Sequence, residues 1–406
     1  MNANRRGLAI YLVARFISTL GGATAPIALA FGVLDISNGS ATALGIVLAA
    51  AAIPNIAFLL IGGVIGDRFP RIRVIQVAGT ISMITEGVAG ALLLTDTASV
   101  PLLATTQVIN GVTSGLCMPA FSGVIPLLAS KSDLRRANSL AAGSIGFAMV
   151  GGTSLGGLLV HAVGPGWGLV FNAATYAVSV AMMSLLKLPR PMPTEPSVLA
   201  DFKDGWRQFI AFGWVWRLVL ASLFLNLINT GVIDVFGPVV ADETFGRATW
   251  GLALSAVTLG SLIATGLAAW TKPSYPLRTG LVMSTAMVGF YLAMGLTAST
   301  PWLLGMALLG GIGAQYLMIN WETALQTRVP TAALSRVSSY DLFGSYLAIP
   351  IAQIMAGFLI AQVAVRPLLI GCAVAFVAVV VVSLTRPAVW HERDQTSEAE
   401  LADANA

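Results

Sequence analysis

Long apolar stretches alternate with short polar ones along almost the whole chain. Each apolar stretch is about 20 residues or somewhat longer, which is enough for a helix to cross the hydrocarbon core of a bilayer. We place about twelve of them, at residues 8–34, 42–65, 74–94, 100–128, 139–162, 168–187, 217–240, 250–270, 278–298, 302–326, 337–362 and 367–386. The pattern predicts an all-α membrane protein with twelve transmembrane helices.

Composition supports this interpretation and narrows the class. Of the 406 residues, 56% are hydrophobic and only 10% are charged, and the mean hydropathy is +0.84. A soluble globule of this length would be far less apolar. Lysine and arginine occur singly between the spans and form no basic face, so nucleic acid is not an expected partner. Cys117 and Cys372 fall inside apolar spans, so neither a disulfide framework nor a metal site is expected.

The basic residues predict an orientation in the membrane. With the N-terminus inside, almost every lysine and arginine outside the spans falls in a cytoplasmic loop, whereas only Arg247 and Arg366 fall on the outer side. This asymmetry is the one that the positive-inside rule describes. We therefore expect a multi-pass protein of the inner (cytoplasmic) membrane, with both termini in the cytoplasm.

The longest polar interruption divides the chain near its middle. It begins as a proline-rich linker and continues into an amphipathic stretch in which Phe202, Trp206 and Phe209 recur at helical spacing. We expect an N-terminal six-helix bundle at 1–188, a cytoplasmic linker with an interfacial helix at 189–216, a C-terminal six-helix bundle at 217–386 and a disordered cytoplasmic tail at 387–406.

The two halves repeat one another at an offset of 200 residues. Pro101 corresponds to Pro301, and Arg136 corresponds to Arg336. Parallel repeats of six spans imply two bundles related by an axis along the membrane normal, with a substrate site between them near the midplane. Transport by alternating access is the mechanism that such an arrangement favours.

A basic hinge separates the second and third spans. Gly63, Asp67, Arg68 and Arg71 occupy the fixed positions of the pattern Gly-x-x-x-Asp-Arg-x-Gly-Arg, while Pro70 replaces its second glycine. The hinge resembles the signature of the major facilitator superfamily of transporters. That resemblance implies the major facilitator fold, with two pseudo-symmetric bundles of six helices.

The resemblance also implies a gate on the cytoplasmic side. In the family, the aspartate at the position of Asp67 meets the N-terminal end of the eleventh helix, where the helix dipole stabilises the closed cytoplasmic side. The expected gating residues are Gly63, Asp67, Arg68, Arg71, Arg136 and Arg336.

Further segments are similar to one branch of this superfamily, the macrolide-efflux and enterobactin exporters. They include Met118-Pro119, the run from Leu134 to Asn138, and Trp321-Glu322. Members of that branch export drugs, siderophores and other amphipathic metabolites, usually against an inward proton flow. The resemblance therefore implies an efflux antiporter of the multidrug-resistance type, acting as a monomer on a small molecule and protons.

Two family patterns are altered in this chain. Gln107 stands where the fourth span of the family carries an arginine linked to proton coupling, and the fifth span lacks the proline of the antiporter pattern. The glycines of that pattern, Gly152, Gly156 and Gly157, remain and permit close helix packing.

Acidic residues inside the spans are the candidates for proton coupling. Asp234 lies in the outer half of the seventh span and Glu86 near the middle of the third, where desolvation disfavours the charged form. The seventh helix lines the cavity in the family and the third is usually peripheral, so Asp234 ranks first and Glu86 second. Glu322 is a further candidate, with pairing to Arg328 as the alternative, and Asp341 is assigned to a cytoplasmic helix end.

The expected residues of the substrate cavity are Arg15, Gln107, Asn226 and Asn229. Arg15 lies about seven residues into the first span, where snorkelling to the interface is the alternative. Asn226 and Asn229 lie on the same helix as Asp234.

Enzymatic chemistry is not expected. The run Gly152-Thr-Ser154-Leu-Gly156 matches a hydrolase pattern, but no strand precedes it, and no lysine follows a glycine as a phosphate-binding loop requires. We therefore expect a secondary active transporter without a cofactor. An importer or uniporter, and a transport-inactive membrane scaffold or sensor of the same fold, remain alternatives.

Overall fold

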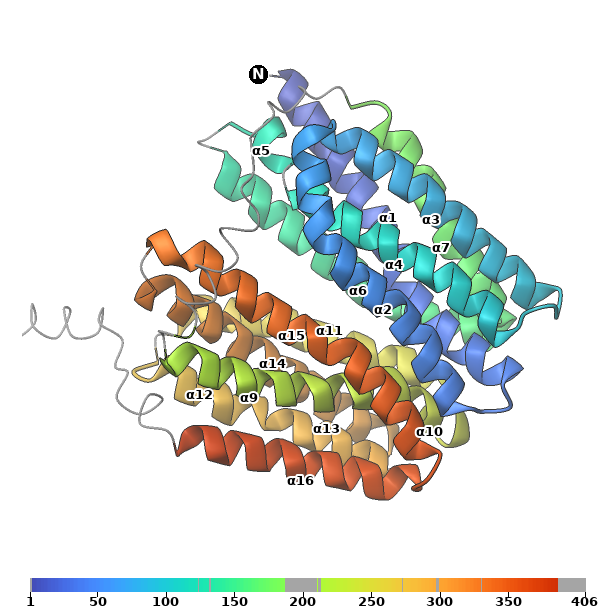
Figure 1. Cartoon of the computed structure of the whole chain (residues 1–406), viewed down its shortest axis with the longest axis vertical. Coiled ribbons are helices and arrows are strands. Elements are labelled where there is room, and N and C mark those ends of the chain that lie inside the picture. The colour runs from blue at the N-terminus through green and yellow to red at the C-terminus, as the bar shows by residue number, and fades with distance from the viewer. Residues whose placement is uncertain are drawn as a thin grey trace, which may run out of the picture. The chain divides into compact units, whose positions relative to one another are not determined.

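The computed structural model describes residues 2–122, 124–130, 133–186, 210, 213–271, 273–296, 299–329 and 331–385. Every regular element in these ranges is a helix, so the prediction of an all-α membrane protein is confirmed (Figure 1). The amphipathic stretch around Trp206 and the tail from 387 to 406 lie outside the described residues. The predicted domain boundaries therefore stay predictions.

The helices belong to two compact units. The first unit comprises Met1–Pro196, Ile233–Ser255 and Gln353–Gln362. Its elements are α1 (Asn2–Ile36), α2 (Ala41–Arg68), α3 (Arg71–Leu94), α4 (Val100–Ser122), α5 (Ile125–Leu128), α6 (Leu134–Val163), α7 (Pro165–Met183), α10 (Gly237–Glu243), most of the π-helical turn η1 (Gly231–Phe236), the start of α11 (Arg247–Trp270) and the end of α15 (Thr331–Ile360).

Close helix contacts at glycine hold the first unit together. Helix α2 runs along α4, while α1 packs against α6 and α7, and α3 against α4 and α7. A methyl group at Gly111 of α4 would collide with the carbonyl oxygen of Ala51 on α2, and one at Gly115 would lie 2.5 Å from the carbonyl oxygen of Asn55. Small residues permit such backbone approach between apolar helices, where van der Waals contact drives association.

The second unit comprises Ser197–Val232, Ala256–Ala352 and Val363–Ala406. Its elements are α9 (Gly213–Thr230), α12 (Pro276–Ser284), α13 (Ala286–Gly295), α14 (Thr300–Arg328), α16 (Val365–Leu384) and the remaining parts of α11 and α15. Helix α14 packs on α12 and α13, and α16 packs on α13 and α9. Gly311 of α14 lies against the backbone of Val257 just as Gly111 lies against Ala51, so the internal repeat is visible in the packing.

Helices occupy each of the predicted span positions. In the described part of the chain, ten helical stretches are long and apolar enough to cross a membrane. Helices α4 and α15 lie at the fourth and eleventh predicted positions, which is consistent with a total of twelve. The seventh predicted span is divided into α9, η1 and α10, and the ninth into α12 and α13.

Within the first unit, the start of α11 is fixed to α1 and α6. The Arg247 guanidinium donates from Nε to Oδ1 of Asp242 at 2.7 Å and from Nη1 to Oδ2 of Asp35 at 2.8 Å. A methyl group at Gly157 of α6 would lie 2.7 Å from the Cα of Gly251 on α11. The two helices therefore meet backbone to backbone beside this ion-paired cluster.

Candidate functional site

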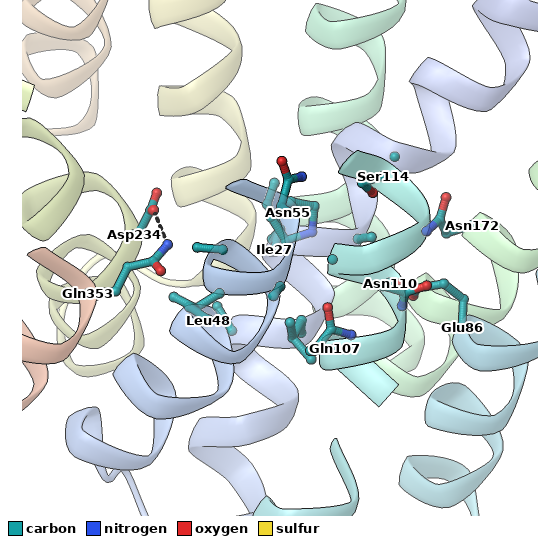
Figure 2. Close-up of a pocket in the computed structure, with 18 of the residues that line it drawn as sticks. Ile27, Leu48, Asn55, Glu86, Gln107, Asn110, Ser114, Asn172, Asp234 and Gln353 are labelled. Atoms are coloured by element: carbon teal, nitrogen blue, oxygen red, sulfur yellow. Dashed lines mark hydrogen bonds between the residues drawn. The ribbon is translucent and has the colours of Figure 1, made fainter. Parts of the chain in front are cut away.

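The first unit contains a cavity of about 370 Å³. Apolar side chains such as Ile27 and Leu48 form much of its wall, and Trp250 closes part of it. The polar side chains that line it are Asn55, Glu86, Gln107, Asn110, Ser114, Asn172, Tyr176, Asp234 and Gln353. In the view of Figure 2, Asp234 with Gln353 and Glu86 with Asn110 lie at opposite ends of the group, with Leu48 and Ile27 between them.

Glu86 of α3 forms one polar end of the cavity. Only 5% of its surface is exposed, and its Oε1 accepts a hydrogen bond from Nδ2 of Asn110 at 2.7 Å. Asn110 is itself fixed, since its Oδ1 accepts from the Thr85 hydroxyl at 2.6 Å. Gln107 and Asn172 also face the carboxyl group of Glu86. The predicted acid of the third span is therefore surrounded by amides inside the bundle.

Asp234 forms the other end, on the π-helical turn η1. Pro238 has no N–H to donate to the carbonyl group of Asp234, so the α-helical hydrogen bond is missing there and a wider turn is accommodated. The Oδ2 atom of Asp234 accepts a hydrogen bond from Nε2 of Gln353 on α15 at 2.9 Å. A methyl group at Gly237 would collide with the Trp250 ring, so the turn packs tightly against α11.

Four polar atoms around this cavity are buried and have no hydrogen-bond partner among the described residues. They are Oε2 of Glu86, Nε2 of Gln107, Oδ1 of Asn172 and Oε1 of Gln353. Leaving such atoms unpaired costs about 1–3 kcal/mol each. Water, or a ligand that offers both donors and acceptors, would satisfy them.

Among the described residues, no lysine, arginine or histidine lines this cavity. A carboxylate buried in such surroundings loses its hydration without gaining a counter-charge, which is costly. Proton binding or a cationic ligand would remove that cost. The two acids that ranked first and second in the sequence thus line one cavity, although the third helix was expected to be peripheral.

Arg15 lines a neighbouring cavity of the first unit, of about 200 Å³. Its guanidinium carbon lies 3.8 Å from the centre of the Phe121 ring, at cation–π distance. The two cavities share Asn55, Ser114 and Tyr176 as lining residues. Arg15 therefore lies beside the cavity that contains Gln107 and not in it.

Asn226 and Asn229 line a different cavity, in the second unit, of about 330 Å³. They lie on the same continuous helical stretch as Asp234, Gly213–Glu243, as the sequence predicted, but Asp234 belongs to the first unit. Asp341 of α15 lines the same cavity as the two asparagines and is only 7% exposed. Its assignment to a cytoplasmic helix end stays a prediction, but its burial was not anticipated; α15 begins at Thr331, well before this residue.

The remaining predicted residues are placed as follows. Arg71 is the first residue of α3, Arg136 is exposed on α6, and Glu322 is exposed on α14. The side chains of Asp67, Arg68 and Arg336, and the surroundings of Gly63, lie outside the described part, so the cytoplasmic gate stays a prediction.

Three predicted packing glycines lie on α6. A methyl group at Gly152 would collide with the Leu20 carbonyl oxygen of α1, and one at Gly156 would lie 3.1 Å from the Cα of Thr24. The Thr24 hydroxyl donates to the carbonyl oxygen of Gly152 at 3.0 Å. Gly157 faces α11, as described above.

Sequence reasoning missed several polar residues of the first cavity. Asn110, Asn172 and Gln353 each interrupt an apolar span, which is the signal that would have identified them. Across the described ranges, no three His, Cys, Asp or Glu side chains converge as a metal site would need.

Comparisons with known proteins agree with this architecture. A sequence model of the Major Facilitator Superfamily matches residues 11–271. The chain is 29% identical over 290 residues to the enterobactin exporters EntS of Shigella boydii serotype 18 and Escherichia coli O127:H6, covering 69% of this chain and 68% of each relative.

Solved structures with the same fold include two transporters. A mutant of the nucleoside transporter NupG matches with a TM-score of 0.78 at 12% identity and covers 93% of this chain and 99% of its own. A bacterial homologue of the human lysosomal transporter Spinster matches with a TM-score of 0.68 at 16% identity and covers 95% and 96%.

Proposed function

Since this chain belongs to the Major Facilitator Superfamily, we propose that it is a secondary active transporter that exports an amphipathic small molecule in exchange for protons. The observation that carries this proposal is the cavity of the first unit, in which two carboxyl groups and several amides line an otherwise apolar space. Small-molecule sites typically combine an apolar wall with a few convergent polar groups.

The two acids have the surroundings that a proton carrier needs. Glu86 accepts an amide hydrogen bond from Asn110 and Asp234 accepts one from Gln353, and no basic side chain in the described part of the chain lines their cavity. Each therefore gains from binding a proton when the cavity is otherwise empty, and from losing it when a ligand supplies donors or positive charge. Competition between proton and substrate for one cavity is the basis of exchange.

Substrate recognition falls to the amides. The free Nε2 of Gln107 donates, while the free oxygens of Asn172 and Gln353 accept, so the cavity suits a molecule with both kinds of group and an apolar body. The relatives named enterobactin exporters favour a siderophore or a similar secondary metabolite, and they favour export as the direction.

We further propose a membrane location and a cytoplasmic gate for this exporter. The exporter lies in the inner membrane with both termini in the cytoplasm, as the distribution of basic residues favours. Its cytoplasmic gate consists of the hinge residues Gly63, Asp67, Arg68 and Arg71 together with Arg136 and Arg336. It acts as a monomer and requires no cofactor.

Transport by the purified protein in liposomes tests this function. With an acidic lumen, antiport drives substrate inward as protons leave, so enterobactin should accumulate above its equilibrium level. A protonophore should abolish that accumulation, and liposomes without protein should show none. Equilibration at the same rate with and without the pH gradient would instead indicate a uniporter.

A further inference from the structure

The cavity of the second unit has a different chemistry from that of the first. Helices α9, α12, α13, α14, α15 and α16 contribute to it, and leucine, methionine, isoleucine and aromatic side chains form most of its wall. Its volume of about 330 Å³ is in the range of small-molecule sites. Among the residues that the structure describes, Asp341 is the single acidic residue that lines it, and no lysine, arginine or histidine does.

Asp341 is held in a fixed orientation with one oxygen free. Its Oδ2 accepts a hydrogen bond from Nε1 of Trp321 at 2.9 Å, and the Trp321 ring packs edge-on against Trp214 with ring centres 6.1 Å apart. Its Oδ1 is buried and has no partner among the described residues. The carboxyl group therefore has one atom available to something that enters the cavity.

None of the described polar groups that line the cavity donates to this oxygen. The Asn229 side chain is oriented elsewhere, since its Oδ1 accepts from the Tyr291 hydroxyl at 2.9 Å. A divalent cation would need several oxygen ligands at once, and a single carboxylate with an indole partner does not provide them. An ammonium group supplies both the missing hydrogen bond and the missing charge.

We propose that this cavity binds a protonated organic amine, whose ammonium group donates to Oδ1 of Asp341 while its apolar body lies among the leucine and methionine side chains. The residues of this cavity take no part in the proposed proton exchange. Amine binding here is therefore independent of the direction, coupling or substrate of transport.

Calorimetric titration of the full-length protein in lipid nanodiscs, with empty nanodiscs subtracted, tests this proposal. The probes are 4-phenylbutylamine and 4-phenylbutanol, which differ in charge but have nearly the same size. The wild-type protein should bind the amine roughly 10- to 100-fold more tightly than the alcohol, the range expected for a hydrogen bond to a charged group.

Three variants distinguish the effect of the Asp341 charge from the effect of the cavity volume. Asp341→Asn should remove the preference for the amine and leave the alcohol affinity within about 3-fold, because the cavity keeps its shape. Ala314→Phe, which fills the cavity from α14, should weaken both probes. Asp96→Asn, the same change at an exposed loop acid, should alter neither.

Several outcomes would overturn the proposal. One is equal binding of amine and alcohol by the wild-type protein, and another is an amine preference that survives both Asp341→Asn and Ala314→Phe. A preference lost only in the double variant Asp234→Asn, Glu86→Gln would assign the amine to the first unit. If Asp341→Asn does not fold, Ala314→Phe and the matched probes still decide the question.

Discussion

At the scale of single residues, amide side chains orient the two acids of the first cavity. Asn110 donates to Glu86 at 2.7 Å and Gln353 donates to Asp234 at 2.9 Å. An amide donor fixes a carboxyl group without supplying a full positive charge, so the carboxyl group is not locked in its ionised form as it would be beside an arginine. Gln107, where the family carries an arginine, fits the same pattern.

The Glu86–Asn110 hydrogen bond leads to a prediction about stability. Glu86→Gln keeps a carbonyl oxygen for Asn110 and should leave thermal unfolding of the purified protein nearly unchanged. Glu86→Leu leaves the Asn110 amide buried and unpaired, so it should lower stability by about 1–3 kcal/mol and lower the apparent Tm. Equal stability of the two variants in a fluorescence melting experiment would show that this hydrogen bond does not order the site.

The residues that could be predicted from the sequence were those with a high free-energy cost of burial in a membrane span. An acid inside an apolar span is expensive enough to stand out, so Glu86 and Asp234 were found. Amides cost less and occur widely in helix packing, so Asn110 and Gln353 were not singled out. The burial of Asp341 was not anticipated, because the predicted span began at 337, whereas the helix begins at Thr331 and carries Asp341 about 15 Å from its start.

At the scale of elements, glycine positions decide how closely helices approach. Gly111 and Gly115 bring α4 onto α2, and Gly157 brings α6 onto Gly251 of α11. The sequence contains these glycines, but which helix each one meets depends on tertiary packing, which spacing alone does not specify. The π-helical turn η1 within the seventh span was likewise missed, although Pro238 marks the place.

The α6–α11 contact can be tested with one methyl group. Gly157→Ala should push the two backbones apart, because the new Cβ would lie 2.7 Å from the Cα of Gly251. We expect a loss of stability of roughly 1–3 kcal/mol, as for other overpacked sites, and slower transport. Gly143→Ala on the same helix is the control, since nothing lies within 4 Å of that position.

The control variant should be neutral or slightly stabilising, by up to about 1 kcal/mol, because alanine favours helix over glycine. Melting curves and initial transport rates of both variants provide the comparison. If Gly157→Ala behaves like Gly143→Ala, the close approach of α6 and α11 is not required.

At the scale of the whole molecule, the alternation of apolar and polar stretches was enough to predict an all-α membrane protein, and the hinge at residues 63–71 indicated the major facilitator fold. The resemblance to the major facilitator superfamily is confirmed by the family match over residues 11–271. The internal repeat reappears in the equivalent packing of Gly111 and Gly311. The cavities could not be predicted, because each is formed by side chains from helices distant in sequence.

The orientation in the membrane is the prediction at this scale. In a background with Cys117 and Cys372 replaced by serine, Thr97→Cys should react with an impermeant thiol reagent added to intact cells. Asp133→Cys should react only after the membrane is permeabilised. Both positions are exposed, so access to the reagent depends on the side of the membrane. The reverse labelling would contradict the orientation derived from the basic loops.

The central claim is that an acid in the first cavity couples transport to protons, and Asp234→Asn tests it most directly. The substitution keeps an oxygen that can accept the hydrogen bond from Gln353 but removes the titrating group. In liposomes, this variant should lose accumulation driven by a pH gradient yet keep exchange of labelled for unlabelled substrate, because exchange needs the conformational cycle without net proton transfer. Asp96→Asn should retain both activities. Accumulation that persists in Asp234→Asn, in Glu86→Gln and in the double variant would contradict the account and favour a uniporter.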